Sequence, residues 1–422
     1  MKLFALADCN NFYVSCERVF NPSIQNVPVV ILSNNDGCII SRSQEAKKIG
    51  IEMGMPAFKA KHFFNKYGVR FFSSNYALYG DMSRRVSNTL ETFSPETEIY
   101  SIDESFISIS ESEIQKVDLL GIEIRQKVLQ WTGIPISVGF GPTKTLAKLA
   151  NRFAKKFTSS GIFTVIPGYA CDKVLELTPV SEIWGIGRKN AYKLNQKGIN
   201  NAREFRDLPD LWLREKLTVT GLRTALELRG ISCIALEDAP PAKKAIVSSR
   251  SFGRQISDIQ QLEEAVSSYT ARATEKLRRQ NSLAGAITVF LMTNPHKNMP
   301  QYSNSICLHL YPETDYTPWI TSKAIYALNR IFKKGYSFKK AGVMLTNLLD
   351  RSGRQISFNE YENSSATQKF ENLMKIVDKT NAKFGSGTLK YASEGIEQNW
   401  KMKQNFKSDN YTTNWNEIPM VY

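Results

Sequence analysis

Acidic residues that directly follow or interrupt apolar runs constrain the fold of this chain most strongly. Leu3–Ala7 is a compact apolar run that predicts a buried strand, and Asp8 follows it directly. Asp103 and Glu104 interrupt Glu98–Ile109, a segment rich in Ile, Ser and Tyr that predicts two strands joined at these acids. Neighbouring strands of one sheet could therefore bring three carboxylates to one point. Because unpaired acids are costly to bury, this arrangement predicts a cation partner.

The residue types around these acids favour Mg²⁺ as that cation. Their side chains offer oxygen ligands only, which Mg²⁺ prefers, and no His or Cys cluster lies nearby. Six cysteines without a CxxC pair and three histidines argue against a structural zinc site. Two Mg²⁺ ions about 3.5 to 4 Å apart are the usual requirement for phosphoryl transfer to a 3′-hydroxyl. Taken singly, each acid favours a structural role, in which Asp8 caps a turn and Asp103 and Glu104 face solvent; the motifs described below favour the metal site instead.

Length and charge set wider limits on the fold and the partner. A chain of 422 residues predicts two to four domains. No apolar run approaches the roughly 20 residues of a membrane span, and the N-terminus has no signal-like segment, so we expect a cytoplasmic protein without membrane contact. The net charge of +15 is typical of a protein that meets a polyanion such as nucleic acid, although a merely basic solvated surface is an alternative.

The first half of the chain predicts an α+β sheet with helices on one face. Val29–Leu32 and Cys38–Ile40 read as a hairpin around an Asp-Gly turn, and apolar spacing predicts a helix over Met82–Phe93. The remaining predicted elements are strand Ile136–Val138, helix Thr143–Lys156 and strand Ile162–Ile166.

The second half predicts a separate folded unit and a tail. A helical segment at about 170 to 230 is followed by a charged linker, Glu237–Lys244. Residues 246–349 then alternate as strand, helix, two strands, helix and strand, which is a βαββαβ unit. From Asp350 onward the chain is polar and Asn-rich, and we expect a tail with local structure only.

Two sets of basic residues are candidates for phosphate contact. Lys144, Lys148 and Lys155 fall within about 40° of one another on helix Thr143–Lys156, opposite an apolar stripe; an ordinary solvated face is the alternative. Residues 246–350 hold 13 Lys or Arg and 7 Asp or Glu, a surplus of 13 − 7 = +6. In that region Arg250 and Arg254 are expected to flank a strand, and one helix face is expected to carry Arg272, Lys276 and Arg279.

Several segments together resemble those of a known family. Asp8–Glu17 (DCNNFYVSCE) and Tyr100–Phe106 (YSIDESF) are similar to the two metal motifs of the Y-family DNA polymerases. Ser33–Cys38, Phe72–Tyr76 and Asp81–Ser83 narrow the resemblance to UmuC-like catalytic subunits of bacterial DNA polymerase V and their plasmid-borne relatives. The similarity runs from residue 1 to the C-terminal tail.

This resemblance implies a right-hand polymerase fold with a ferredoxin-like palm, small fingers, a helical thumb with a helix-hairpin-helix, and a βαββαβ little finger. The implied parts are palm 1–20 and 76–166, fingers 21–75, thumb 167–236, linker 237–245, little finger 246–350 and C-terminal tail 351–422.

The resemblance also implies roles for individual residues. The ligands of two Mg²⁺ ions would be the catalytic Asp8, Asp103 and Glu104 together with the backbone carbonyl of Cys9. Contacts to the incoming nucleotide would come from Tyr13, Ser41, Lys47 and Lys155. Tyr13 matches the second aromatic of the family's paired motif and would exclude ribonucleotides, whereas Phe12 suits a core position. Gln44 and Lys47 stand where the family commonly has an aromatic and an Arg.

Two further motifs point to DNA and to a partner protein. Ile183–Arg188 fits the centre of a helix-hairpin-helix, in which Gly185, Gly187 and Arg188 would contact a DNA phosphate; a simple turn between helices is the alternative. Gln355 and Phe358 resemble a sliding-clamp peptide, although the second large apolar anchor of such peptides is replaced by Asn.

Together these observations predict an error-prone translesion DNA polymerase of the SOS response. Its expected partners are primer-template DNA, deoxynucleoside triphosphates, a processed UmuD-like dimer, a RecA filament and a sliding clamp. A palm-type nucleotide cyclase and a non-catalytic DNA-binding protein are the alternatives. The predicted thumb and little finger disfavour the cyclase, and intact Asp8, Asp103 and Glu104 disfavour the non-catalytic protein.

Overall fold

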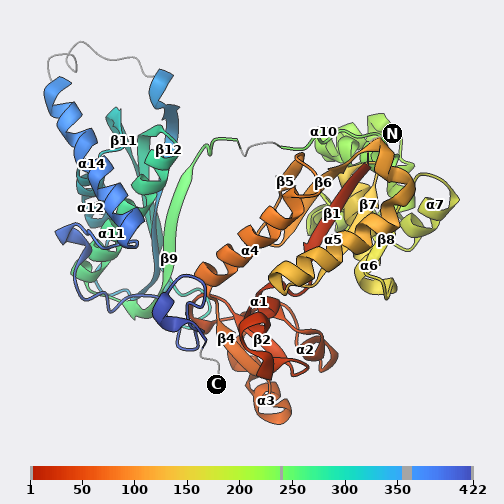
Figure 1. Cartoon of the computed structure of the whole chain (residues 1–422). Helices are drawn as coiled ribbons and strands as arrows, with labels where there is room; N and C mark the ends of the chain where they lie inside the picture. The colour runs from red at the N-terminus through yellow and green to blue at the C-terminus, as the bar shows by residue number, and fades with distance from the viewer. Residues whose placement is uncertain (1–2, 238–240, 354–363, 420–422) are drawn as a thin grey trace. The chain divides into compact units, whose positions relative to one another are not determined.

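The computed structural model describes residues 3–237, 241–353 and 364–419. The chain forms two compact units (Figure 1). Unit 1 comprises Met1–Ser33, Gly37–Pro240 and Phe406–Tyr422, and unit 2 comprises Asn34–Asp36 and Pro241–Asn405. The chain therefore leaves unit 1 at about residue 240 and returns to it at Phe406. Within the described ranges, no helix is long and apolar enough to cross a membrane.

A five-stranded sheet forms the centre of unit 1, with strand order β5-β6-β1-β7-β8. All neighbours are antiparallel except β7 and β8. The strands are β1 (Leu3–Cys9), β5 (Thr97–Ile99), β6 (Glu104–Ile109), β7 (Ile136–Gly141) and β8 (Ile162–Thr164). The predicted strands before Asp8 and on both sides of Asp103 and Glu104 are therefore confirmed.

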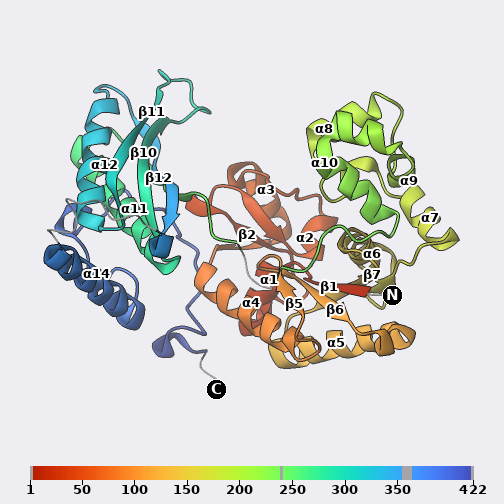
Figure 2. The ribbon, with the colours of Figure 1, turned by 90° about the horizontal axis from the view of Figure 1, so that it is seen from above.

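Helices cover both faces of this sheet, so the prediction of helices on one face was wrong. Leu3, Ala5 and Ala7 of β1 face a core shared with α4 (Tyr76–Glu91) and α5 (Val117–Thr132). The alternate residues of β1 pack with Ala147 of α6 (Lys144–Phe157) on the other face (Figure 2). Every residue of β1 is buried, and an uninterrupted apolar strand of this kind indicates burial on both faces.

Two smaller elements of unit 1 complete the surroundings of the sheet. A three-stranded sheet with order β3-β2-β4 follows α1 (Phe12–Phe20), and the predicted hairpin of β2 and β3 is confirmed. Residues 169–228 form the predicted helical segment, and they share a core with Leu146, Leu149 and Phe153 of α6. The elements are β2 (Val29–Leu32), β3 (Ile39–Arg42), α2 (Gln44–Lys48), α3 (Ala57–Tyr67), β4 (Arg70–Ser73), α7 (Tyr169–Glu176), α8 (Arg188–Asn195), α9 (Ala202–Arg206) and α10 (Asp210–Leu228).

Unit 2 contains the predicted βαββαβ order around a four-stranded antiparallel sheet, β11-β10-β12-β9. Its core lies between this sheet and the two helices. The elements are β9 (Ile246–Ile256), α11 (Ile259–Arg279), β10 (Ser282–Thr293), β11 (Ser303–Thr314), α12 (Thr317–Ile331) and β12 (Phe338–Asp350).

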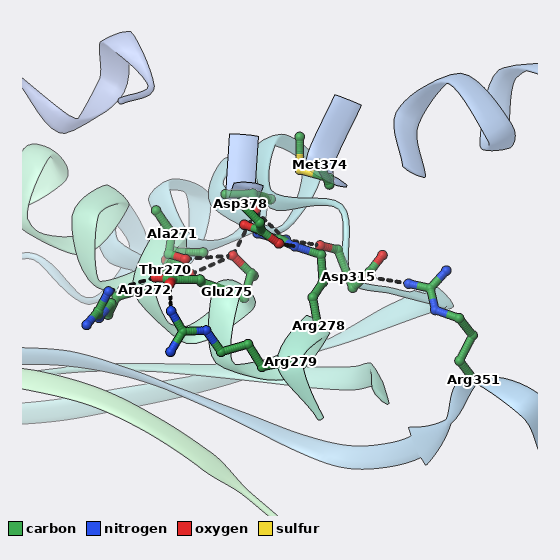
Figure 3. A network of polar contacts seen from close by, with 12 residues as sticks. Thr270, Ala271, Arg272, Glu275, Arg278, Arg279, Asp315, Arg351, Met374 and Asp378 are labelled. Carbon is green, nitrogen blue, oxygen red and sulfur yellow. Dashed lines mark hydrogen bonds and ion pairs between the residues drawn. The ribbon is translucent and has the colours of Figure 1, made fainter. Parts of the chain in front are cut away.

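The tail has more structure than expected. Helix α14 (Ser364–Phe384) is 21 residues long and is held to the rest of unit 2 by ion pairs. Arg278 of α11 binds Asp378 of α14 through two nitrogens, at 2.6 and 2.8 Å, and also donates to the backbone oxygen of Asp315 at 2.8 Å (Figure 3). Paired, bidentate Arg–carboxylate contacts of this kind fix a helix in one orientation. Residues 406–419 belong instead to unit 1.

Candidate active site

Strand pairing brings the three predicted carboxylates to one edge of the unit 1 sheet. Asp8 on β1 lies directly opposite Glu104 on β6. The backbone nitrogen of Cys9 donates to the backbone oxygen of Asp103 at 2.8 Å. Ser101 donates to Oδ1 of Asp103 at 2.6 Å and so orients that side chain. A local turn and an antiparallel register are thus enough to gather residues almost 100 positions apart.

Three lysines of α6 pair with acids from three different strands. The pairs are Lys155 with Asp8, Lys148 with Glu104 at 2.6 Å, and Lys144 with Glu98. Lys144 is only 1% exposed and Glu98 only 7%, so this end of the predicted lysine stripe is a buried counter-ion and not a phosphate-binding or solvated face. Helical periodicity placed the lysines on one side of α6, but it could not indicate that this side faces the sheet.

The surroundings of Asp8 disfavour a negative charge. Burial raises the pKa of Asp8 to about 7; Lys155 opposes this shift, and nearby Glu104 adds to it. Burial also raises the pKa of the Cys9 thiol well above its ordinary value, and that side chain lies in the core, so only the Cys9 backbone is suited to face a ligand. A carboxylate in such a place is stabilised by a bound cation.

The donor set fits hard cations such as Mg²⁺, because it consists of carboxylate and backbone oxygens. Among the residues that the structure describes, no three His, Cys, Asp or Glu side chains are grouped around one metal position. Asp8 and Glu104 are turned toward lysines instead. Like-charged carboxylates at one strand edge repel, and the lysines of α6 relieve that repulsion.

A cavity of about 350 Å³ opens beside the acids and brings the predicted nucleotide contacts together. Its walls include the predicted residues Asp8, Cys9, Tyr13, Ser41, Lys47, Asp103 and Lys155. Lys47 donates to Oδ1 of Asn11 at 2.6 Å. Burial, together with neighbouring Arg42 and Lys155, lowers the pKa of Lys47. The cavity therefore joins a carboxylate edge to a cationic wall, an arrangement suited to a triphosphate and its metal ions.

Tyr13 is half-buried at this cavity, whereas Phe12 is in the core with 3% of its surface exposed. The Tyr13 ring stacks on Tyr79 with centroids 4.5 Å apart and an interplanar angle of 15°. Tyr76 meets the same ring edge-on at 6.2 Å. Tyr13 therefore presents a supported aromatic face to the cavity.

Sequence reasoning missed two features of the site, namely Arg42 and the contact of Lys148 with Tyr100 and Trp184. Arg42 lines the cavity directly after Ser41 on β3, a neighbour relation that could have indicated it. Lys148 lies 4.3 Å from the ring centre of Tyr100 and 5.3 Å from that of Trp184, and Trp184 donates to the Tyr100 hydroxyl at 3.2 Å. No local pattern indicates a contact between the hairpin at Trp184 and the metal motif at Tyr100.

The residues predicted to contact DNA do not line this cavity. The structure supports the local geometry expected for some of them and corrects it for others. Gly185 has a φ of 91°, which favours glycine, and Gly187 caps the N-terminus of α8, where exposed Arg188 begins the helix. Arg250 and Arg254 are exposed, but they lie inside β9 and do not flank it. Gln355 and Phe358 lie outside the described residues.

The predicted basic face of α11 is largely neutralised. Arg272 and Arg279 both bind Glu275, at 2.7 and 2.5 Å (Figure 3). Burial and the adjacent arginines lower the pKa of Lys276. The charge surplus of this region therefore overstates the number of cations that are open to a phosphate, because acids one helical turn away were counted without regard to position.

Comparisons with known proteins agree with this geometry. Residues 7–152 match the impB/mucB/samB family, and residues 243–358 match the C-terminal domain of the same family. The protein UmuC of Salmonella typhimurium is 42% identical over 99% of this chain and 100% of its own length. MucB of Escherichia coli is 36% identical over 99% of both chains.

The chain belongs to the UmuC-like Y-family DNA polymerases. It is a DNA-directed DNA polymerase of translesion synthesis and SOS-type mutagenesis, in a family that is generally metal-dependent. DNA polymerase IV of Oceanobacillus iheyensis is 26% identical over 95% of this polymerase and 94% of its own chain. A chimera of the Y-family DNA polymerases Dbh and Dpo4 covers 82% of it with a TM-score of 0.66 at 21% identity, which supports the fold. Residues 371–421 match a domain of unknown function, DUF4113.

Proposed function

We propose that this polymerase adds deoxynucleotides to a primer 3′-hydroxyl opposite damaged template bases, with Asp8, Asp103 and Glu104 and the backbone carbonyl of Cys9 as ligands of two Mg²⁺ ions. The observation that carries the proposal is the strand register that sets Asp8 opposite Glu104, with Asp103 bonded to Cys9, at the wall of a cavity lined by cations. Two bound ions would acidify the attacking hydroxyl and neutralise the leaving pyrophosphate.

The chain's own residues would hold the triphosphate and orient it for attack. Lys155 and Lys47 supply positive charge on two sides of the cavity, and buried Ser41 supplies a hydroxyl donor. On nucleotide binding, Lys155 would exchange its partner Asp8 for a phosphate oxygen, which leaves Asp8 free to bind a metal ion. Tyr13 would pack against the sugar and leave no room for a 2′-hydroxyl.

The other parts of the polymerase would grip DNA through its backbone. We assign residues 1–20 and 76–166 to the palm, 21–75 to the fingers, 167–236 to the thumb and 246–350 to the little finger. Gly185, Gly187 and Arg188 would present backbone N–H groups and a cation to a duplex phosphate. Arg250 and Arg254 on β9 would add phosphate contacts that carry no sequence information. Such contacts suit a polymerase that accepts distorted templates.

The expected partners follow from the family. By its 42% identity with UmuC, this polymerase is expected to act with a processed UmuD-like dimer and a RecA filament, on DNA in the bacterial cytoplasm. Primer extension opposite an abasic site, with and without these two partners, tests the proposal directly. We expect insertion opposite the lesion in Mg²⁺, with greater yield when both partners are present. Failure to extend even an undamaged template in every condition would contradict it.

A sliding-clamp contact at Gln355 and Phe358 is a separate proposal. Replacing both residues by Ala should reduce clamp-stimulated synthesis and leave clamp-free synthesis unchanged. Primer extension on a circular template with and without loaded clamp measures the difference. Equal stimulation of the variant and the wild type would place the clamp contact elsewhere on the polymerase.

A further inference from the structure

The last described part of the chain belongs to unit 1 and packs against the end of β4 in the three-stranded sheet. We call residues 406–417 the clasp. The backbone nitrogen of Ser73, at the end of β4, donates to the oxygen of Phe406 at 3.0 Å, and the nitrogen of Phe406 donates to Ser73 Oγ at 3.0 Å. The Phe406 ring packs edge-on against Phe71 at 4.8 Å.

The clasp also binds the residue that caps α4. Asn75 is fully buried, and its Oδ1 accepts from the backbone nitrogen of Leu78 at 3.3 Å, which satisfies the start of the helix. Its Nδ2 donates to the backbone oxygens of Ser408 and Asp409, at 3.2 and 3.1 Å. The Asn75 side chain thus has two roles: its oxygen caps the N-terminus of α4, and its nitrogen binds the clasp.

A buried carboxylate completes the connection. Glu17 of α1 is 1% exposed, and its Oε1 accepts from the Tyr79 hydroxyl at 2.7 Å and from the Ser408 hydroxyl at 3.0 Å. Within the part of the chain that the structure describes, Glu17 has no ion-pair partner, and burial raises its pKa. A buried carboxylate is costly unless it is hydrogen-bonded, so each of these hydroxyls has a large effect on the position of the Glu17 carboxylate.

Tyr79 carries this connection to the nucleotide cavity. Its side chain is fully buried on α4, and its ring is the one that stacks on Tyr13. Tyr13 and Glu17 are also one helical turn apart on α1. A continuous series of contacts therefore runs from Ser408 through Glu17 and Tyr79 to Tyr13.

We propose that the clasp is a determinant of sugar selectivity, in which Ser408 and Asn75 are positioning residues that hold the Tyr13 ring through Glu17 and Tyr79. The inference rests on the proposed role of Tyr13 as the gate against ribonucleotides. It gives residues 406–417 of the domain of unknown function a task in the reaction. A ring that excludes one hydroxyl must be held within a fraction of an ångström, and such precision comes from the shell of residues behind it.

Two full-length variants weaken the attachment of the clasp and change no residue that lines the cavity. Ser408→Ala removes one donor to Glu17 and also one acceptor of the Asn75 amide, whose Nδ2 donates to Ser408 Oγ at 3.1 Å. Asn75→Asp keeps the oxygen that caps α4 but places a second oxygen against the carbonyls of the clasp, which repel it. Single-nucleotide insertion with dCTP and CTP opposite template G gives the ratio of the two kcat/KM values. We expect this ratio to fall about fivefold in Ser408→Ala and about tenfold in Asn75→Asp, both on the order of the net contribution of one buried hydrogen bond, while dCTP insertion changes less than about twofold.

Matched controls separate positioning from general loosening of the fold. Asn201→Asp changes another helix-capping asparagine, which caps α9. Ser386→Ala removes a hydroxyl that accepts from Arg272 at 2.8 Å in unit 2. We expect wild-type dCTP to CTP ratios in both. Equal loss of selectivity in these controls would overturn the proposal, and so would wild-type ratios in folded Ser408→Ala and Asn75→Asp proteins.

A double-mutant cycle distinguishes failure of the clasp from failure of the gate. Tyr13→Ala alone should lower the ratio on the order of 100-fold. If it leaves the ratio unchanged, the gate is wrong and the clasp proposal falls with it. If it lowers the ratio, adding Ser408→Ala should have no further effect, because both changes act through one ring. A further multiplicative loss would show that the clasp does not act through Tyr13 and would overturn the proposal while the gate stands.

Discussion

The two large sheets of this polymerase handle charge in opposite ways. In the unit 1 sheet, acids sit on the strands and the lysines of one helix, α6, pair with them. In unit 2, exposed arginines sit on the edge strand β9, while the arginines of helix α11 are bound to acids of α11 and α14. Counting charges along the sequence treats both regions as sources of phosphate contacts. The comparison teaches that pairing in three dimensions, and not net charge, decides which cations are open to a ligand.

The largest effect should come from the acids of the unit 1 sheet. Asp103→Asn or Glu104→Gln should lower nucleotide addition more than about 10³-fold, because each removes a metal ligand, while primer-template affinity changes less than about twofold. Single-turnover insertion and equilibrium DNA binding measure the two quantities. Asp118→Asn, an exposed acid in the first turn of α5, is the control. Extension at the wild-type rate by either variant would show that the substituted acid is not part of the active site.

The buried pair of Lys144 and Glu98 should matter more for stability than any pair on α11. Lys144→Met leaves a buried carboxylate without its counter-ion and should lower the free energy of unfolding by about 3 to 5 kcal/mol. Arg279→Met, which breaks an exposed pair, should change it by less than about 1 kcal/mol. Urea denaturation gives both values. Adding Glu98→Gln to Lys144→Met should recover much of the loss, and similar values for the two single variants would contradict the contrast.

Lys155 and Lys156 are adjacent on α6, but only Lys155 pairs with Asp8. Comparing variants of the two tests whether this pairing indicates a catalytic role. Lys155→Ala should lower kcat/KM for the incoming nucleotide about 100-fold, because it removes a charge from the cavity. Lys156→Ala should stay within about twofold, since Lys156 is half exposed and lies 3.7 Å from Glu182. Steady-state insertion kinetics opposite an undamaged template compare them. Equal losses in both variants would indicate a general effect of positive charge.

The exposed arginines of β9 should affect DNA binding alone. Arg250→Ala or Arg254→Ala should weaken primer-template binding about three- to tenfold and reduce the slope of log K against log salt by about 1 for each phosphate contact that is lost. Arg279→Ala is the matched control, because Glu275 already neutralises that arginine. Binding titrations at several salt concentrations give the slopes. An unchanged slope in both β9 variants would remove this strand from the DNA-binding surface.

The smallest expected effect concerns the pH dependence of stability that Glu17 causes. This buried acid of unit 1 is hydrogen-bonded by two hydroxyls and is not paired with a lysine. Its pKa in the folded protein lies above its ordinary value of 4.5. The native state therefore holds this proton more tightly than the unfolded state, and stability falls as the pH rises from 4.5 through the folded pKa. Glu17→Gln lacks this dependence, so its stability relative to the wild type should rise between pH 5 and pH 8. Urea denaturation at both values checks this, and a relative fall would reverse the sign.

The local elements and the ends of the strands that carry the acids could be predicted from the sequence alone. The continuous apolar run before Asp8 and the short strands around Asp103 and Glu104 are readable because strand formation depends on neighbouring residues. The order of the βαββαβ unit follows for the same reason. The family motifs also lie within short segments, so they need no knowledge of the fold.

The contacts of the α6 lysines and of the last residues of the chain could not be predicted from the sequence, because they depend on how distant segments pack together. Periodicity shows that Lys144, Lys148 and Lys155 share a face of α6. That this face meets acids of the sheet depends on how α6 packs in the whole domain. Ser408 binds a carboxylate 391 residues earlier in the chain. A polar contact over such a distance leaves no periodic pattern, because Ser and Asn in an irregular segment have the same local signature whether they are solvated or buried against another part of the fold.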